Sequence, residues 1–275
     1  MEKLKWLKWM VFWVAVAVIV AIALDQRMIV RRYTVEAEEI NAPVRLAVVT
    51  DLHECDYGEN GAELTAEIGR HEPDAVLLVG DMFADGGDYA YGLSVMRTLA
   101  AAYPTYYVTG NHEYWTNDID RILMLVTDAG VTVLDQSCAV LEVRGQRISL
   151  CGVPDPYAMV YSGAPDTHVQ LARTRAQAEQ GTFTMLMAHR PELIDLYAAA
   201  GFDLVVAGHA HGGQVRVPGL LNGLYAPNQG WFPAYAGGEY RVGDTKMIVS
   251  RGLARESTRA PRVFNRPELV IVTLE

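Results

Sequence analysis

The stretch VRLAVVTDLH, residues 44–53, shows a pattern that recurs along the rest of the chain. Its first part, residues 44–50, is a short apolar run of the kind that forms a buried strand. Asp51 and His53 follow directly, so a carboxylate and an imidazole stand where the strand passes into a loop. In open α/β sheets, binding sites form at the carboxyl ends of the strands. The stretch therefore predicts a buried strand that carries two candidate metal ligands at its end.

Four further apolar runs end in polar clusters in the same way. Each is a short strand-like segment followed at once by carboxylate, amide or imidazole side chains: residues 75–79 before Gly80-Asp81, residues 105–108 before Gly110-Asn111-His112-Glu113, residues 182–188 before His189, and residues 204–207 before Gly208-His209-Ala210-His211. One such cluster is a weak signal, because a single histidine is most often a core or surface residue. All five clusters fall at strand ends, and this recurrence predicts a shared site.

The side chains in these clusters form a set of nitrogen and oxygen donors without a thiolate. Such a set suits borderline or hard divalent ions such as Mn, Fe, Zn or Co. In a strand-end loop, Asp-x-His can direct both side chains toward one ion, and His-x-His can do the same or divide its imidazoles between two ions. A carboxylate such as Asp81 can bridge two ions roughly 3.5–4 Å apart. The candidate ligands are Asp51, His53, Asp81, Asn111, His189, His209 and His211.

The segments around these clusters alternate between strand and helix patterns. Helices are predicted at residues 62–70, 89–102, 118–129, 167–180 and 191–200. Short strands are predicted at residues 131–134, 139–143, 148–152, 239–242, 247–250 and 269–274. Strand–helix–strand units on both sides of a hairpin-rich section predict an α/β fold with two packed sheets flanked by helices. No internal linker is evident, so we expect one catalytic domain.

A long apolar segment precedes the first of these strands. Residues 9–24 carry no charge, and counted from Trp6 the stretch is about 19 residues long, which suits a membrane span. It is flanked by three lysines and three arginines: Lys3, Lys5, Lys8, Arg27, Arg31 and Arg32. We therefore expect residues 1–35 to form an N-terminal membrane anchor with a short linker, and residues 36–275 to form the catalytic domain.

Two other interpretations of the apolar segment are open. A cleaved signal peptide has the same basic start and apolar core, and Ala21-Ile22-Ala23 would be its cleavage site. A helix buried in the soluble fold is the second alternative, although a helix without a polar face suits lipid better. Because the flanking positive charges are equal in number, the positive-inside rule does not decide which side of the membrane carries the domain.

The net charge and the cysteines limit the partners and the compartment. The formal net charge of −10 argues against broad DNA binding, which needs a basic surface. No nucleic acid partner is expected, and no protein partner can be inferred. Cys55, Cys138 and Cys151 are too few for a disulfide framework. One bridge is compatible with an extracytoplasmic domain, and three thiols are equally natural in the cytosol. Cys55 lies near His53 but is not counted as a ligand, because the other residues supply a full set.

The ordered clusters resemble the calcineurin-like metallophosphoesterase superfamily, and the resemblance covers the chain from about Val44 onward. Further stretches narrow it to the bacterial membrane-associated branch with phosphodiesterases of the YkuE and YaeI type, which is related to UDP-2,3-diacylglucosamine pyrophosphatases. These stretches are residues 188–192, residues 208–214, and residues 250–253 with Arg262 and Pro267-Glu268-Leu269.

The resemblance implies a four-layer αββα sandwich, preceded here by an N-terminal transmembrane helix, with two divalent metal ions. It implies one ion at Asp51, His53 and His211, a second at Asn111, His189 and His209, and Asp81 as the bridge. His112 would be the catalytic residue, stabilising the transition state or protonating the leaving oxygen. Glu113 would orient His112 or hold its loop. Asp85 follows Asp81 at a spacing that varies in the superfamily, and no metal role is assigned to it.

Three functions compete at this point. The first is a membrane-bound phosphodiesterase or pyrophosphatase acting on a lipid-linked substrate such as UDP-2,3-diacylglucosamine. The second is a phosphoesterase acting on soluble nucleotides or cell-wall phosphodiesters. The third is a non-enzymatic metal-binding scaffold, against which the complete ligand set with His112 argues. Several apolar residues would either line a lipid-facing groove or pack in the core: Leu220, Leu221, Leu224, Trp231 and Phe232.

Overall fold

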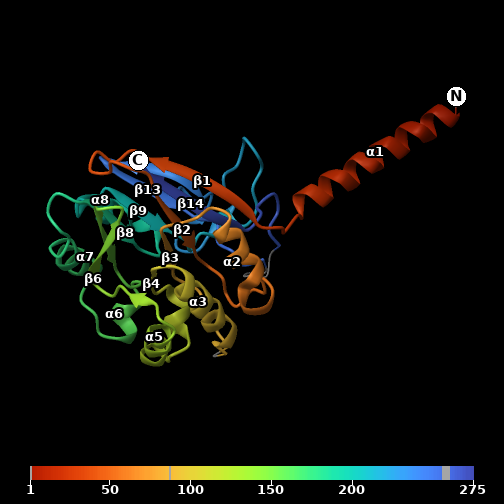
Figure 1. Ribbon diagram of the computed structural model, residues 1–275. Helices are drawn as coiled ribbons and strands as arrows, with labels where there is room; N and C mark the ends of the chain where they lie inside the picture. Colours follow the sequence, from red (N-terminus) through yellow and green to blue (C-terminus); the bar gives the residue numbers. More distant parts are fainter. Residues whose placement is uncertain (1, 87, 256–260) are drawn as a thin grey trace.

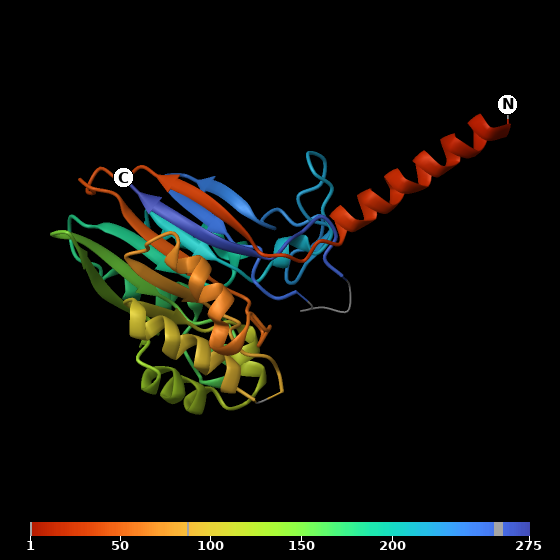
Figure 2. The same ribbon diagram turned by 45° about the vertical axis from the view of Figure 1, so that its right-hand side comes forward.

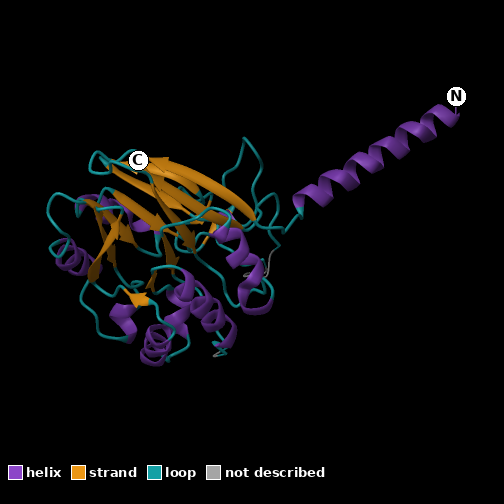
Figure 3. Cartoon of the chain, in the orientation of Figure 1, coloured by secondary structure: helices purple, strands orange, loops and turns teal. Residues whose placement is uncertain are grey.

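The computed structural model describes residues 2–86, 88–255 and 261–275. Helix α1 (Glu2–Ala23) projects away from the rest of the chain, which folds around two six-stranded sheets (Figure 1). Helices cover the outer faces of both sheets (Figure 3). The chain therefore has the four-layer αββα arrangement that the sequence predicts.

The first sheet combines the N-terminal half of the domain with the last strand. Its order is β1-β14-β2-β3-β4-β5. The strands are β1 (Ile29–Val35), β2 (Val44–Val49), β3 (Ala75–Val79), β4 (Thr105–Val108), β5 (Thr132–Val133) and β14 (Glu268–Leu274). β2 to β5 are parallel, whereas β14 pairs antiparallel to β2 and parallel to β1. The crossover helices are α2 (Ala62–Gly69), α3 (Ala90–Ala102) and α5 (Ile119–Asp128).

The second sheet has the order β12-β13-β9-β8-β7-β6. Its strands are β6 (Ser137–Val143), β7 (Gln146–Gly152), β8 (Phe183–Met187), β9 (Leu204–Ala207), β12 (Gly238–Val242) and β13 (Thr245–Val249). The four central strands are parallel, and a hairpin closes each edge. Its crossover helices are α7 (Thr167–Arg175) and α8 (Ile194–Ala199). Shorter elements are α4 (Asn111–Trp115), α6 (Ala158–Tyr161), η1 (Glu59–Gly61), η2 (Pro191–Leu193), η3 (His211–Gly213), β10 (Tyr225–Ala226) and β11 (Gly230–Trp231).

Burial on both faces explains the composition of the central strands. All five residues of β3 (AVLLV) are buried, because one face of the sheet packs on the second sheet and the other packs on helices. Leu77 belongs to the core between the sheets, and Leu78 belongs to the core under α2, α3 and α5. A third core fills the space between the second sheet and α7 and α8. These three apolar layers hold the strand ends in fixed positions.

Helix α1 is the one element of the described chain that is long and apolar enough to cross a membrane. Its apolar residues are exposed, so it is not a core helix, and that interpretation of the segment is wrong. Only its C-terminal end touches the domain, where Ala23 is buried and its carbonyl oxygen accepts a hydrogen bond from the amide of Phe264 (2.7 Å). Figure 2 shows α1 leaving the domain beside the loop between η3 and β10.

The structure confirms the predicted strands and helices within a few residues, apart from the α7 segment, which ends at Arg175 rather than at residue 180. Three strands were not predicted: the two-residue strands β10 and β11, and the longer strand β1. Ile29–Val35 lies in the segment interpreted as a linker, yet it forms β1 at the edge of the first sheet. Its sequence, IVRRYTV, carries two exposed arginines in the middle, so it lacks the apolar run by which buried strands were recognised. The folded domain therefore includes residues before position 36, where the sequence analysis had placed its start.

Candidate metal centre

The five polar clusters lie together where the central strands of the two sheets end. β2, β3 and β4 are neighbours in the first sheet, and β8 and β9 are neighbours in the second. Because these strands are parallel within each sheet, their carboxyl ends lie at the same edge. Asp51, Asp81 and Asn111 follow the first three strands, and His189 and His209 follow the other two. The predicted clusters therefore converge on one buried site.

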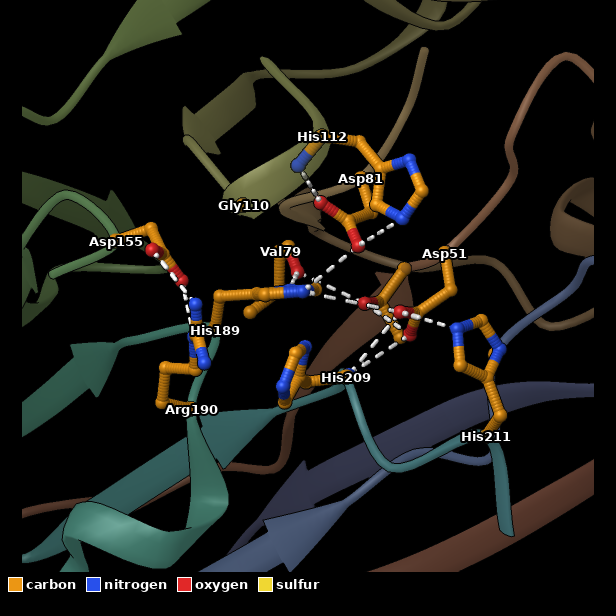
Figure 4. Close-up of polar contacts among 12 residues, drawn as sticks. Asp51, Val79, Asp81, Gly110, His112, Asp155, His189, Arg190, His209 and His211 are labelled. Carbon is orange, nitrogen blue, oxygen red and sulfur yellow. Dashed lines mark hydrogen bonds and ion pairs between the residues drawn. The ribbon is translucent and has the colours of Figure 1, made fainter. Parts of the chain in front are cut away.

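Seven side chains of this site form three groups, and within each group the ligand atoms all lie within 4.8 Å of one another. The groups are Asp51, His53 and His211; His53, Asp81 and His112; and Asp81, His189 and His209. His189 lies between the two carboxylates, 3.1 Å from Asp81 Oδ2 and 3.8 Å from Asp51 Oδ1 (Figure 4). The first group has the same residues as one expected trio, and the third contains His189 and His209 of the other together with Asp81, the expected bridge.

Several buried polar atoms of the site have no hydrogen-bond partner among the residues that the structure describes. They are His53 Nε2, Asp81 Oδ2, Asn111 Oδ1 and His189 Nε2. A buried polar atom without a partner costs about 1–3 kcal/mol, so four in one place call for an explanation. Metal ions supply one, because these atoms are the nitrogen and oxygen donors that divalent ions bind. The residues present therefore fit a metal site.

The backbone of the site adopts an uncommon conformation. Asp51, His53, Asp81, His209 and His211 all have positive φ, between 46° and 65°. Left-handed backbone is unfavourable for residues other than glycine and concentrates at functional sites. Here it turns the chain sharply at the end of each strand, so that consecutive side chains face the same point. Sequence patterns did not predict this conformation.

Two glycines are required because the site is crowded. A Cβ atom on Gly208 would lie 2.0 Å from Thr50 Oγ1 and 2.5 Å from Asp51 Oδ2. A Cβ atom on Gly110 would lie 2.2 Å from Asp81 Oδ1. Any side chain at either position would displace a candidate ligand carboxylate.

The electrostatics of the site favour a bound cation. Burial lowers the pKa of His53 to about 3 and holds the pKa values of His209 and His211 well below the usual range, so these imidazoles are neutral donors. Burial would also lower the pKa of His189, but Asp81 and Asp51 raise it to about 10. The two carboxylates thus draw positive charge toward the point where the ligand groups overlap.

His112 lies at the mouth of the site with Asp85 behind it. Its side chain is 18% exposed, and its Nε2 is 3.9 Å from Asp81 Oδ2. On the other side of the ring, Nδ1 lies 2.5 Å from Asp85 Oδ1. The backbone amide of His112 donates to Asp81 Oδ1 (2.9 Å). The sequence gives no signal for this role of Asp85, because its contact with His112 depends on how residues 82–85 turn back toward α4.

Glu113 holds the loop after β3. Its buried carboxylate accepts hydrogen bonds from the amides of Gly110, Asp81, Met82 and Phe83. Burial raises the pKa of Glu113 to about 7, with repulsion from Asp81 adding to the effect. Of the two roles considered for Glu113, the hydrogen bonds favour the second, since this carboxylate fixes the loop that carries Asp81.

Further residues hold the histidines from behind. Asn228 Oδ1 lies 2.9 Å from His209 Nε2 and also accepts a hydrogen bond from Arg190, which forms a buried ion pair with Asp155. Asn265 Nδ2 donates to the carbonyl oxygen of His211 (2.7 Å). Val79 O lies 2.8 Å from His189 Nδ1, which leaves Nε2 directed at the carboxylates. None of these contacts has a local sequence signal, because the partners lie far apart along the chain.

Comparisons with known proteins agree with this geometry. The family model described as calcineurin-like phosphoesterase matches residues 44–213. A metallophosphoesterase of Campylobacter jejuni is 29% identical over 90% of this chain, and the match spans 63% of that protein. Bacillus subtilis YkuE, also a metallophosphoesterase, is 26% identical over 84% of this chain and 79% of its own length. The Escherichia coli phosphodiesterase YaeI is 27% identical over 85% of this chain and 83% of its own length.

Proposed function

The chain belongs to the calcineurin-like phosphoesterase family, and on that premise we propose that it is a membrane-anchored hydrolase that cleaves a phosphodiester or pyrophosphate bond with two divalent metal ions. The observation that carries the proposal is a chain of three potential metal-binding groups, joined to one another through His53 and Asp81, with His112 in the middle group. A scaffold that only stores metal would have no use for an imidazole at the mouth of the site.

Within this proposal, Asp51, His53 and His211 hold one ion, Asn111, His189 and His209 hold the other, and Asp81 bridges them. The metal identity is one of Mn, Zn, Fe or Co, because the donor set excludes thiolate but includes several imidazoles. When bound, such an ion pair clamps a phosphoryl group and activates a water molecule. The chain itself keeps the ligands in place through its strand ends and the Glu113 hydrogen bonds.

His112 then acts on the leaving group. Its Nε2 faces the site. The carboxylate of Asp85 accepts a hydrogen bond from Nδ1 and so fixes the orientation of the ring. In this arrangement the imidazole donates a proton from Nε2 to the oxygen that leaves phosphorus, a role suited to histidine near neutral pH. Asp85 is a positioning residue, because it touches His112 and not the ligand groups.

Replacement of His112 by alanine tests the proposed function. We expect the turnover of a soluble phosphodiester to fall about 100- to 10,000-fold while both metal ions stay bound. Turnover and metal content of the full-length protein are measured together, with His168→Ala on the exposed face of α7 as the control. If H112A retains wild-type turnover, the catalytic assignment is wrong, and absence of turnover in the metal-loaded wild type would favour the scaffold.

The proposal includes a lipid-linked substrate, for which UDP-2,3-diacylglucosamine is one candidate. Its support is the proposed anchor, which would hold the domain against the bilayer, and a set of exposed apolar residues in the segment after η3. Leu220 is 85% exposed, Trp231 68% and Phe232 67%, so packing in the core does not explain them. Comparing turnover of a detergent-dispersed lipid pyrophosphate with turnover of a soluble model diester tests this part of the proposal.

The same proposal places the domain outside the cytoplasm. Cys138 and Cys151 face each other on β6 and β7 and form a disulfide bond, which persists in oxidising compartments. Of the flanking arginines, Arg27 pairs with Asp25 and the other two lie in β1. Lys3, Lys5 and Lys8, which precede the apolar stretch of α1, are then the free positive charges. By the positive-inside rule they would lie on the cytoplasmic side of the membrane. The division into an anchor and one phosphoesterase domain is part of this proposal.

An aromatic rim favours soluble nucleotides as a second candidate substrate. Trp115 packs against His112 with ring centres 4.5 Å apart, and Tyr157 and Tyr161 continue the cluster. Exposed aromatic rings stack on nucleobases, each worth about 1–3 kcal/mol. If Trp115→Ala weakens turnover of a nucleotide diester but not of a lipid pyrophosphate, the soluble substrate is the better assignment.

A further inference from the structure

Two adjoining cavities lie beside the base of α1. Their volumes are about 440 and 390 Å³, and both are lined by Arg31, Pro218, Arg251 and Phe264. The lining of the first also includes Arg216 and Leu220, and that of the second also includes Arg266 and Ile22. None of the candidate metal ligands lines either cavity. Together these cavities are called the basic pocket below.

The basic pocket carries an excess of positive charge. Of its four arginines, Arg251 pairs with buried Glu268 (3.2 Å) and Arg266 pairs with Asp25 (3.4 Å). Arg31 and Arg216 have no ion-pair partner among the described residues. Burial lowers the pKa of Arg216 to about 10, and repulsion from Arg251 contributes. Two guanidinium groups that line the same cavity without an ion pair of their own form a favourable site for an anion.

The position of the pocket identifies the kind of anion. Ile22 is the penultimate residue of α1, so the pocket opens where the anchor would emerge from the bilayer. On its other side stands the loop between η3 and β10, which carries Leu220 and partly exposed Val217 (Figure 2). Exposed apolar side chains next to guanidinium groups suit the part of a bilayer where acyl chains meet charged headgroups.

We propose that the basic pocket binds the phosphate of an anionic phospholipid in the leaflet from which the domain emerges. Arg31 and Arg216 contact the phosphate, and Leu220 and Val217 lie against the acyl region. The proposal rests on the membrane anchorage proposed above but not on the hydrolytic activity. Arg216 Nη1 also lies 3.5 Å from the carbonyl oxygen of Gly212, next to His211, so a bound headgroup would sit directly behind the metal-binding loop.

Lipid retention by the full-length protein tests the proposal. The protein is reconstituted in nanodiscs of phosphatidylcholine with phosphatidylglycerol, and lipids retained after release are identified by native mass spectrometry. We expect preferential retention of phosphatidylglycerol, and about a fivefold loss of that preference in Arg31→Gln and again in Arg216→Gln. The matched control is Arg32→Gln, the next residue of β1, which is exposed, contacts His71 and lines neither cavity. Thermal unfolding and metal content confirm that each variant is folded.

Two results would overturn the proposal. The first is a missing preference: the wild type retains both lipids in equal amounts, or Arg31→Gln prefers phosphatidylglycerol as strongly as the control Arg32→Gln does. The second combines two measurements. If the protein in pure phosphatidylcholine binds millimolar inorganic phosphate, and the protein in mixed nanodiscs shows no preference for phosphatidylglycerol, the pocket is a site for a soluble anion. Turnover of a soluble diester by Arg31→Gln should match that of the wild type, so failure here is distinct from failure of the proposed hydrolase.

Discussion

The backbone amide of Phe264 donates a 2.7 Å hydrogen bond to the carbonyl oxygen of Ala23, which joins the end of α1 to the catalytic domain. Two further contacts reinforce this junction, from Gln26 to the carbonyl of Arg262 and from Arg266 to Asp25. Asn265, which follows Phe264 in the chain, donates a side-chain hydrogen bond to the carbonyl oxygen of His211. One short segment thus contacts both the anchor and the metal centre, and we expect it to fix how the site faces the membrane.

Insertion of Gly-Ser-Gly between Leu24 and Asp25 should uncouple the anchor from the site. We expect turnover of a bilayer-embedded lipid pyrophosphate to fall roughly tenfold or more, because the site loses its fixed position at the surface. Turnover of a soluble diester should not change. The control is the same insertion in the exposed Gly243-Asp244 turn between β12 and β13. An equal loss on both substrates would show that the insertion damages the fold instead.

Replacement of Asp85 by asparagine tests its role behind His112. We expect kcat to fall about 10- to 100-fold with unchanged metal content, because the imidazole loses the carboxylate that orients it. The loss should be smaller for a substrate whose leaving group is a weak base, since that group needs no proton. Asp88→Asn, an exposed acid of the same loop, is the control. A loss that is independent of the leaving group would separate Asp85 from proton donation.

Gly208→Ala should disrupt metal binding through its Cβ atom alone. The added atom would meet Thr50 and Asp51, and we expect fewer than two bound ions per chain and a loss of about 1–3 kcal/mol in the free energy of unfolding. Gly86→Ala is the matched control, because nothing lies within 4 Å of its Cβ position and neither glycine has positive φ. Bound metal is counted by elemental analysis. Two tightly bound ions in G208A would contradict the crowded geometry described for this loop.

Glu54 should make stability depend on pH. Burial raises the pKa of Glu54 from 4.5 to about 7, so across this interval the folded chain holds a proton that the unfolded chain has lost. The free energy of unfolding should therefore fall as pH rises from 4.5 to 7. Glu54→Gln should remove this slope and be more stable at pH 8 by about 1 kcal/mol, allowing for partial exposure. Urea unfolding across pH measures it, with exposed Glu59→Gln as the control. Parallel curves for wild type and E54Q would disprove the effect.

The Cys138–Cys151 disulfide bond leads to a prediction about compartment. Alkylation of the protein in intact membranes without reductant should modify Cys55 only, whereas reduction should expose three thiols. The bond closes a loop of 13 residues, and Cys138→Ser with Cys151→Ser should cost about 3 kcal/mol in the free energy of unfolding. Three modified thiols before reduction would place the domain on the cytosolic side.

Local patterns were sufficient to predict most of the fold and most of the residues that lie together at the candidate site. Buried strands such as β3 have continuous apolar runs, and His189 and the other candidate ligands directly follow such runs. Features that depend on distant contacts were not predictable. β1 is recognisable only from its pairing with β14, and Asp85 only from its contact with His112. Likewise, the left-handed backbone of Asp51 is set by the packing around it, since its side chain gives no signal for positive φ.

The position of β14 between β1 and β2 has a consequence for biosynthesis. β1 follows the anchor directly, but β14, the strand it pairs with, begins only at Glu268. While the chain is being made, β1 therefore stays unpaired next to the proposed anchor, and the edge of β2 that faces away from β3 stays open. Open strand edges pair readily with other chains. β14 is made after every other strand that the structure describes and closes both edges at once, so a chain that stalls before Glu268 would expose these edges and be prone to aggregation.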